Sequence, residues 1–206
     1  KPKKPNIVFR TLLKLVSLPN MLFTGFKAER IGMEKLSKKE PCLILMNHSS
    51  FTDMKLAYGI FYPKKIGIVT SVDAMTGILG KLMRLIGCTP THKYVSDLSL
   101  IKDIKYMLNE NKTSVLMYPE AGYSFDGCTT TLPRRMGVLM KQLGVPVVTV
   151  ITQGAFHRDP LYNMLQIRDV KVSAHVKCIA TAEEVKTKSV EELDALLDES
   201  FSFDNF

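Results

Sequence analysis

From residue 41 onward, short apolar runs alternate with amphipathic stretches, and this alternation restricts the possible fold more than any other feature. A short continuous apolar run bounded by turn residues favours a strand buried on both faces, and apolar residues three and four apart favour a helix. The pattern therefore predicts an α/β domain with a mostly parallel central sheet covered by helices. The expected strands are residues 42–46, 66–70, 114–118, 145–152 and 170–176, and the expected helices are 51–61, 79–86, 98–108, 134–143 and 190–197.

Residues 6–26 are mostly apolar, with Arg10 and Lys14 as the charged side chains within them. Their pattern predicts one or two short amphipathic helices, broken near Pro19. Two interpretations remain open. The apolar face enters a lipid surface while the cations lie at headgroup level, or the helix packs on the core. We expect residues 1–30 to form a basic membrane-associating segment and residues 31–206 to form one catalytic domain.

The composition excludes a disordered chain, and the distribution of charge indicates the kind of surface that the protein binds. The chain has 206 residues, of which 46% are hydrophobic and 23% charged, so it can bury a core and is not compositionally disordered. The net charge of +8 is unevenly spread: residues 1–40 hold ten Lys and Arg against three acids, and residues 181–206 hold two against eight. A basic amino-terminal arm suggests a polyanionic surface, either anionic lipid or nucleic acid.

The spacing of the cysteines indicates the redox environment of the protein, and the hydropathy of the chain indicates whether it contains a transmembrane helix. The four cysteines are separated by 40 residues or more, without a CxxC pair, so we expect reduced thiols, no zinc site and a cytosolic environment. No stretch reaches the roughly 18 uncharged apolar residues of a transmembrane helix.

The segment NHSSFTD follows the first strand expected after residue 41. It places His48 on a turn and Asp53 in the first turn of the next helix. An imidazole is a better general base when a carboxylate holds its other ring proton, and a strand-to-helix turn allows the two side chains to meet. The alternative is structural, because Ser50-x-x-Asp53 also matches a helix capping box.

The segment YPEAGYS follows the third strand expected after residue 41. Glu120 can hydrogen-bond an acceptor hydroxyl or organise the turn, and Gly122 admits a ligand close to the backbone. The structural alternative is an ordinary strand followed by a turn.

Together these segments resemble the glycerolipid acyltransferase family. Its Asn-His-x4-Asp block corresponds to Asn47, His48 and Asp53, and its Gly-x5-Arg block corresponds to residues 87–93, with Lys93 in place of arginine. Its Phe-Pro-Glu-Gly-Thr-Arg-Ser block aligns with residues 118–124, and its Val-Pro-rich strand aligns with residues 145–150. The resemblance covers about residues 30–180, with four blocks in the correct order.

The resemblance implies transfer of a fatty acyl group from acyl-CoA or acyl carrier protein to a hydroxyl of a lysophospholipid such as 1-acylglycerol-3-phosphate. His48 and Asp53 would form the general-base pair, without metal or further cofactor. In this sequence Tyr123 replaces the arginine that helps hold the acceptor phosphate, so Lys93, Arg134 and Arg135 are the candidate replacements. The predicted substrate-binding residues are Asn47, Lys93, Glu120, Ala121, Gly122, Tyr123, Ser124, Arg134 and Arg135.

Three alternatives accompany this interpretation. An acyl-cysteine route would use Cys128, which has no evident local base partner. A non-catalytic peripheral membrane protein could retain the fold and bind lipid without turnover. A basic nucleic-acid-binding module is less favoured, because no recognition motif accompanies the charge. We expect a cytoplasmic protein, peripheral on the inner face of the membrane, that binds anionic lipid and no nucleic acid.

Overall fold

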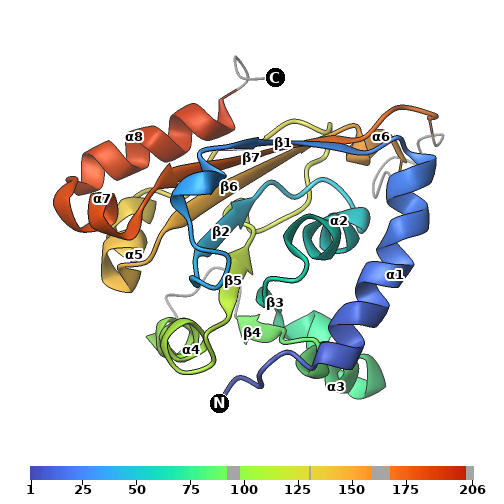
Figure 1. Cartoon of the computed structure of the whole chain (residues 1–206), viewed down its shortest axis with the longest axis horizontal. Helices are drawn as coiled ribbons and strands as arrows, with labels where there is room; N and C mark the ends of the chain where they lie inside the picture. Colours follow the sequence, from blue (N-terminus) through green and yellow to red (C-terminus); the bar gives the residue numbers. More distant parts are fainter. Residues whose placement is uncertain (92–97, 130, 159–167, 203–206) are drawn as a thin grey trace.

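The computed structural model describes residues 1–91, 98–129, 131–158 and 168–202, which form one α/β domain (Figure 1). Helices alternate with strands through most of the chain, as the apolar pattern predicts. In chain order, the described elements are α1 (Ile7–Phe23), β1 (Lys27–Ile31), η1 (Met33–Lys35), β2 (Leu43–Met46), α2 (Thr52–Phe61), β3 (Ile66–Ser71), η2 (Val72–Met75), α3 (Gly77–Leu85), β4 (Thr89–Thr91), α4 (Leu98–Asn109), β5 (Ser114–Met117), α5 (Met136–Leu143), β6 (Val147–Gln153), α6 (Ala155–Arg158), β7 (Ser173–Ala180), α7 (Ala182–Thr187) and α8 (Val190–Phe201).

The seven described strands form one sheet in the order β1-β7-β6-β2-β5-β3-β4. The pairs from β6 through β4 are parallel, β7 runs antiparallel to β6, and β1 is parallel to β7. At the centre, β2 lies between β5 and β6, with Leu45 in register with Met117 and Thr149. The mostly parallel sheet predicted from the apolar runs is confirmed, and β2 is buried along its whole length.

Helices cover both faces of the sheet (Figure 1). Alternate residues of β2 point to opposite faces, which divides the core into two clusters. Ile44 and Met46 belong to the cluster that includes residues of α1, α2 and α3, and Leu43 and Leu45 belong to the cluster formed with α4, α5, α7 and α8. This double covering explains why the central strands consist of apolar residues without alternation.

Helix α1 runs unbroken through Pro19, so the break predicted near that residue is wrong. Proline removes one backbone hydrogen bond from the helix, and packing compensates because Leu13 and Met21 lie against the core beside α2. Arg10 is buried and donates a hydrogen bond to the carbonyl oxygen of Pro63, and burial lowers the pKa of its guanidinium. The core-packing alternative is therefore correct for this face of α1.

The opposite face of α1 remains apolar and exposed. Leu22 and Phe23 are 77% and 83% exposed, and Val8, Leu12 and Leu15 are exposed along the same helix. The predicted domain boundary at residue 30 falls inside β1, whose residues pair with β7. No helix in the described ranges has both the length and the hydropathy required to span a bilayer.

Several elements differ from the sequence prediction at the carboxyl-terminal part and at the edges of the sheet. The last strand occupies Ser173–Ala180 rather than residues 170–176, because it extends to pair with the whole of β6. Strand β1 is absent from the prediction because four of its five residues are exposed and carry no apolar alternation. Helices α7 and α8 each begin with a complete capping box, at Thr181 and Ser189.

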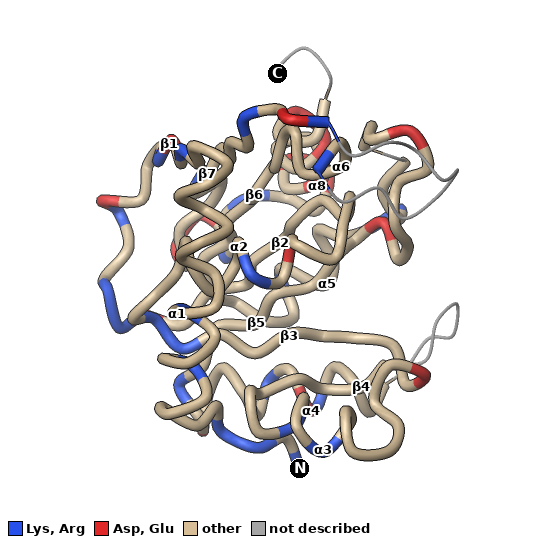
Figure 2. Tube along the Cα trace, turned by 90° about the vertical axis from the view of Figure 1, so that its right-hand side faces the viewer, with Lys and Arg blue, Asp and Glu red and all other residues tan. Residues whose placement is uncertain are grey.

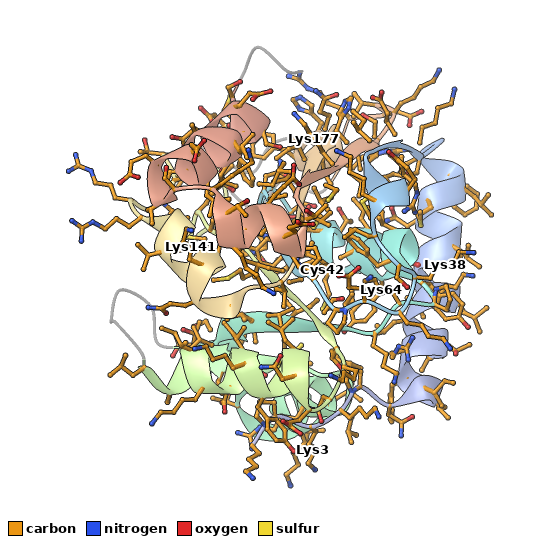
Figure 3. The ribbon with its side chains drawn as sticks, turned by 60° about the vertical axis from the view of Figure 1, so that its left-hand side comes forward. Lys3, Lys38, Cys42, Lys64, Lys141 and Lys177 are labelled. Carbon is orange, nitrogen blue, oxygen red and sulfur yellow. The ribbon has the colours of Figure 1, made fainter. Side chains whose placement is uncertain are left out.

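Charged residues occur mainly in the outer segments of the chain trace (Figure 2), and their side chains lie mainly outside the two core layers (Figure 3). Lys141 on α5 and Lys177 on β7 lie on the side of the molecule away from α1, whereas Cys42 lies inside (Figure 3). Burial raises the pKa of the Cys42 thiol, and the four cysteines are free, as expected from their spacing.

The contact between α1 and α2 can be tested at Gly59. A Cβ atom at Gly59 would run into the sulfur of Met21 on α1. Gly59→Phe should lower the free energy of unfolding by about 1–3 kcal/mol through overpacking and should accelerate amide hydrogen exchange in residues 7–23. Met21→Ala in the same chain should restore part of the protection because it frees the space. Unchanged exchange in Gly59→Phe would contradict the docked position of α1.

Candidate active site

The two segments that the sequence singles out meet at the carboxyl edge of the sheet. The loop from Asn47 to Phe51 follows β2, and the loop from Tyr118 to Ser124 follows β5. Because β2 and β5 are adjacent and parallel, their following loops emerge side by side. This is the edge where ligands bind in open α/β sheets.

His48 and Asp53 form a hydrogen-bonded pair. Nδ1 of His48 lies 3.0 Å from Oδ2 of Asp53, whose carboxylate is fully buried, whereas the His48 side chain is 15% exposed. A carboxylate only accepts hydrogen bonds, so the proton between them belongs to Nδ1 and Nε2 is left as the basic nitrogen. The expected meeting of these side chains is present in the fold.

The carboxylate of Asp53 also orders the loop that carries His48. Oδ2 accepts hydrogen bonds from the backbone N–H groups of Ser49 at 2.7 Å and Ser50 at 3.0 Å. The capping-box alternative is half correct, because Ser50 Oγ accepts from the N–H of Thr52 instead of that of Asp53. Asp53 thus orders the turn that leads into α2 and holds the imidazole with the same oxygen.

The loop after β5 holds the main chain of His48 from the other side. Glu120 Oε2 accepts the backbone N–H of His48 at 2.7 Å, and the N–H of Ser124 donates to the carbonyl oxygen of His48 at 2.8 Å. Ser124 Oγ contacts Asp126 and accepts the N–H of Gly127, so it also organises its own turn. Glu120 and Ser124 therefore fix the position of His48 through its backbone.

Ala121 occupies a backbone conformation that glycine adopts more easily. Its φ of +56° lies in the left-handed region, at the position where the related block has glycine. At Gly122, which follows it, an added Cβ atom would meet no heavy atom within 4 Å, so the site is open there. A residue that carries a Cβ atom loses roughly 1–2 kcal/mol in this conformation, so the loop holds Ala121 in a strained backbone geometry.

Asn47 joins two strand ends behind the site. Its Nδ2 donates to the carbonyl oxygen of Thr152 at 3.0 Å, and its Oδ1 accepts from the N–H and Oγ1 of Thr152 at 2.8 Å and 3.0 Å. Asn47 is 4% exposed. These contacts secure β2 to β6 directly before His48, and a direct contact of Asn47 with substrate stays a prediction.

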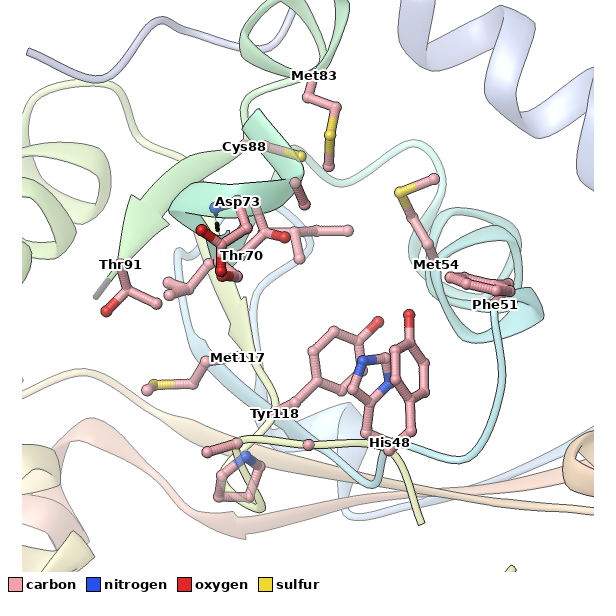
Figure 4. Close-up of a pocket in the computed structure, with 18 of the residues that line it drawn as sticks. His48, Phe51, Met54, Thr70, Asp73, Met83, Cys88, Thr91, Met117 and Tyr118 are labelled. Carbon is pink, nitrogen blue, oxygen red and sulfur yellow. Dashed lines mark hydrogen bonds between the residues drawn. The ribbon is translucent and has the colours of Figure 1, made fainter. Parts of the chain in front are cut away.

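The imidazole of His48 lies between two tyrosine rings (Figure 4). The ring centroid of Tyr118 is 3.8 Å away with an interplanar angle of 15°, and that of Tyr123 is 3.7 Å away at 32°. Phe51 contacts Tyr123 edge to face at 5.4 Å. Asp53 fixes the imidazole within its plane and the two tyrosines fix the plane itself, which leaves the ring little freedom.

A pocket of about 620 Å³ opens beside His48 (Figure 4). Its walls are mostly apolar and come from α2, β3, η2, α3, β4, α4, β5 and the start of α5. Cys88 forms part of the wall, and burial raises the pKa of its thiol to about 12, so it stays protonated at neutral pH. The apolar side chains that line it include Met54, Ile68, Leu79, Met83, Met117 and Met136.

Of the three cations predicted to bind the acceptor phosphate, the structure describes the two arginines. Arg134 and Arg135 are exposed, between Pro133 and Met136, which both line the pocket. Arg135 is the N-cap of α5 in a left-handed conformation. Lys93 lies outside the described residues. The structure therefore brings both arginines to the chain segment at the pocket wall, and their binding role stays a prediction.

Comparison with known proteins identifies the family. The family model Acyltransferase matches residues 27–153, which is more than half of the chain. The chain belongs to this acyltransferase family. The matched range runs from β1 through β6 and contains both loops of the site. The family predicted from the four sequence blocks is confirmed.

A solved structure has the same fold as this acyltransferase. The crystal structure of the 1-acyl-sn-glycerophosphate (LPA) acyltransferase PlsC from Thermotoga maritima superposes with a TM-score of 0.67. The match covers 93% of this chain and 76% of that chain, at 17% sequence identity. At this identity the likeness establishes the arrangement of the sheet and its helices.

Sequence reasoning misses three parts of the acyltransferase site. Tyr118 aligns with a family phenylalanine, but nothing in the alignment places it against His48, and no pattern links Thr152 to Asn47. The pocket walls are also missed, although the apolar residues of segment 77–85 form one face of a helix with Lys81 and Arg84 beside them. This amphipathic pattern is the sequence feature from which part of the pocket wall could have been predicted.

The stacking of His48 gives a spectroscopic prediction. Tyrosine rings parallel to the imidazole should shift its carbon-bound proton resonances upfield by ring currents, and Tyr123→Leu should move them back towards ordinary values. Tyr123→Phe should leave the shift in place because the ring remains. The His175 resonance is an internal reference, since it pairs with Glu29 at the far edge of the sheet. Equal His48 shifts in Tyr123→Leu and the unaltered protein would contradict the stacking.

Proposed function

We propose that this acyltransferase moves a fatty acyl group from a thioester donor, acyl-CoA or acyl carrier protein, to a hydroxyl of a lysophospholipid such as 1-acylglycerol-3-phosphate. The observation that carries the proposal is the His48–Asp53 pair at the wall of an apolar pocket of about 620 Å³. Membership of the acyltransferase family supports the reaction class, and the pocket chemistry supports an acyl chain as ligand.

In the proposed reaction, Nε2 of His48 removes the proton of the acceptor hydroxyl as its oxygen attacks the thioester carbonyl carbon. Backbone N–H groups of the two loops stabilise the oxyanion, and the carbon–sulfur bond then breaks. The imidazolium returns its proton to the departing thiolate, which leaves as a free thiol. Asp53 stabilises the imidazolium, since its carboxylate lies 3.0 Å from Nδ1.

Tyr118 and Tyr123 support the same step in this proposal. The faces of aromatic rings carry partial negative charge and attract cations, so rings on both faces of the imidazole favour its charged form. They also keep His48 oriented between turnovers. An aromatic side chain at residue 123 thus serves the base, where related proteins have an arginine for the acceptor.

An acyl-cysteine intermediate has less support than direct transfer. Desolvation and the neighbouring Asp126 raise the pKa of the Cys128 thiol, which disfavours the nucleophilic thiolate. The pocket cysteine is Cys88, whose thiol is also held protonated. Neither thiol is as well prepared for reaction as the hydrogen-bonded imidazole.

The remaining parts of the proposal concern location and partners. The exposed apolar face of α1 and the basic amino-terminal residues support binding to an anionic membrane surface, where the lysophospholipid acceptor resides. We place the protein in the cytoplasm, peripheral on the inner face of the membrane. The acyl thioester is a substrate, and the proposed chemistry uses no separate cofactor, metal or nucleic acid.

The central test of this function is the loss of His48. His48→Ala should reduce kcat by at least about 10²-fold, the usual contribution of a general base, with a lysolipid panel and both donor types assayed by product mass. Asp53→Asn should also reduce turnover severely, and the lost capping should lower stability by about 1 kcal/mol.

A matched control separates catalysis from folding. Ser200→Ala on α8 removes a buried hydrogen bond to Thr149 on β6 that lies outside the pocket, so its effect should fall on melting temperature. If folded His48→Ala retains the kcat of the unaltered protein, the proposed mechanism is wrong. Lipid binding without turnover by the unaltered protein would instead favour the non-catalytic alternative.

The acceptor headgroup is tested at the arginines. If the acceptor carries a phosphate, Arg134→Gln should raise its KM about fivefold, as expected for loss of roughly 1 kcal/mol from an exposed ion pair. The donor KM and the use of an uncharged monoacylglycerol should stay unchanged. Tyr123→Arg should improve the use of phosphate-bearing acceptors as substrates only if the natural acceptor lacks a phosphate. If neither Arg134→Gln nor Tyr123→Arg changes the acceptor kinetics, the acceptor headgroup does not bind in this part of the site.

A further inference from the structure

Helix α3 presents an apolar face to solvent at the mouth of the pocket. Ile78 is 87% exposed, Leu79 is 61% exposed and Leu82 is 45% exposed. Three neighbouring large apolar side chains on a nine-residue helix are more than the scattered exposure of an ordinary surface. The other face of the helix is tightly packed, because a Cβ on Gly80 would run into the backbone of Met75.

The exposed face of α3 continues into the pocket. Leu79 both lines the pocket and reaches solvent, and Met83, one turn further on, lines the interior. Phe51 also lines the pocket and is 60% exposed. Leu79 and Met83 therefore connect the exposed surface of α3 to the cavity that His48 also lines.

The carboxyl end of α3 adjoins the amino end of α1. The N–H of Asn6, directly before α1, donates to the carbonyl oxygen of Leu85 at the end of α3 at 3.0 Å. The two helices lie at the same end of the molecule (Figure 1). Neither helix contains an acidic residue, whereas Lys81 and Arg84 on α3 are exposed, and Lys and Arg gather around this end (Figure 2).

We propose that α3 is a second lipid-contacting helix, which inserts Ile78, Leu79 and Leu82 into the acyl boundary of an anionic leaflet. Lys81 and Arg84 then lie at headgroup level, and an acyl chain passes from the leaflet along Leu79 into the pocket. Apolar side chains flanked by Lys81 and Arg84 match an anionic lipid surface, and the nearest acid in the sequence, Asp73, lies in η2 and lines the pocket. A second copy of the chain fits less well, because the same basic surfaces would face each other.

This inference rests on the proposed function for the contents of the pocket, but its test does not require turnover. The sequence contains no tryptophan, so a single introduced indole is an unambiguous reporter. Ile78→Trp in the full chain should show blue-shifted emission with vesicles of phosphatidylcholine and phosphatidylglycerol. Bromine atoms on the acyl chains of those lipids should quench it. Val138→Trp, on α5 at the opposite side of the sheet, should show neither effect.

The cations give a second measurement. Lys81→Gln and Arg84→Gln should each weaken binding to these vesicles about fivefold at low salt, as expected for cations at an anionic surface, and the difference should shrink at high salt. Lys186→Gln on α7 removes the same charge from the distant side and should leave binding unchanged. On vesicle-embedded acceptor the double variant should lose activity, and on a short-chain soluble acceptor it should retain activity.

The outcomes separate this proposal from the proposed function. If Leu22→Trp on α1 is quenched by brominated lipid but Ile78→Trp is not, α3 does not contact the bilayer and the acyltransferase mechanism is unaffected. If neither reporter responds, docking of α3 is likewise wrong. Quenching of Ile78→Trp in a protein that shows no turnover with any lysolipid would support docking and overturn the proposed reaction.

Discussion

The parallel pairing of β2 with β5 at the centre of the sheet is the constraint on which the site depends. It brings two loops separated by about 70 residues to one edge, where Glu120 and Ser124 hold the N–H and the carbonyl group of His48. The loop after β5 therefore continues to hydrogen-bond the chain two residues beyond the end of β2, at His48. The strands hold the start of each loop, and the hydrogen bonds with Asp53, Glu120 and Ser124 restrict the orientation of His48.

Asp53 orders the loop and holds the His48 imidazole with the same carboxylate. Its buried carboxylate needs hydrogen-bond donors, and it obtains them from the N–H groups of Ser49 and Ser50 as well as from His48. The same contacts shape the turn and begin α2. These contacts show that a carboxylate which orders a turn can also hold an imidazole, so the structural and catalytic interpretations of Asp53 do not exclude each other.

The surroundings of the pair also explain how the chain accommodates its departures from related sequences. Tyr123 lies against His48 and Phe51, so its side chain belongs to the environment of the base rather than to a separate headgroup site. Ala121 accepts a left-handed conformation between ordered neighbours. The altered block therefore positions His48 through Glu120, Ser124 and Tyr123.

The amino-acid pattern alone is enough to predict the α/β class, the central strands and the pairing of His48 with Asp53. Buried strands must be apolar on both faces, and five residues across a strand-to-helix turn can meet through local geometry alone. Features that depend on distant segments emerge only in the folded chain. Packing on α2 keeps α1 continuous through Pro19, pairing with β6 extends β7, and the loop after β5 stacks Tyr118 and Tyr123 on the imidazole. The pocket is likewise assembled from eight helices and strands between α2 and α5, because the side chains that enclose a cavity are brought together by the fold and not by their spacing in the chain.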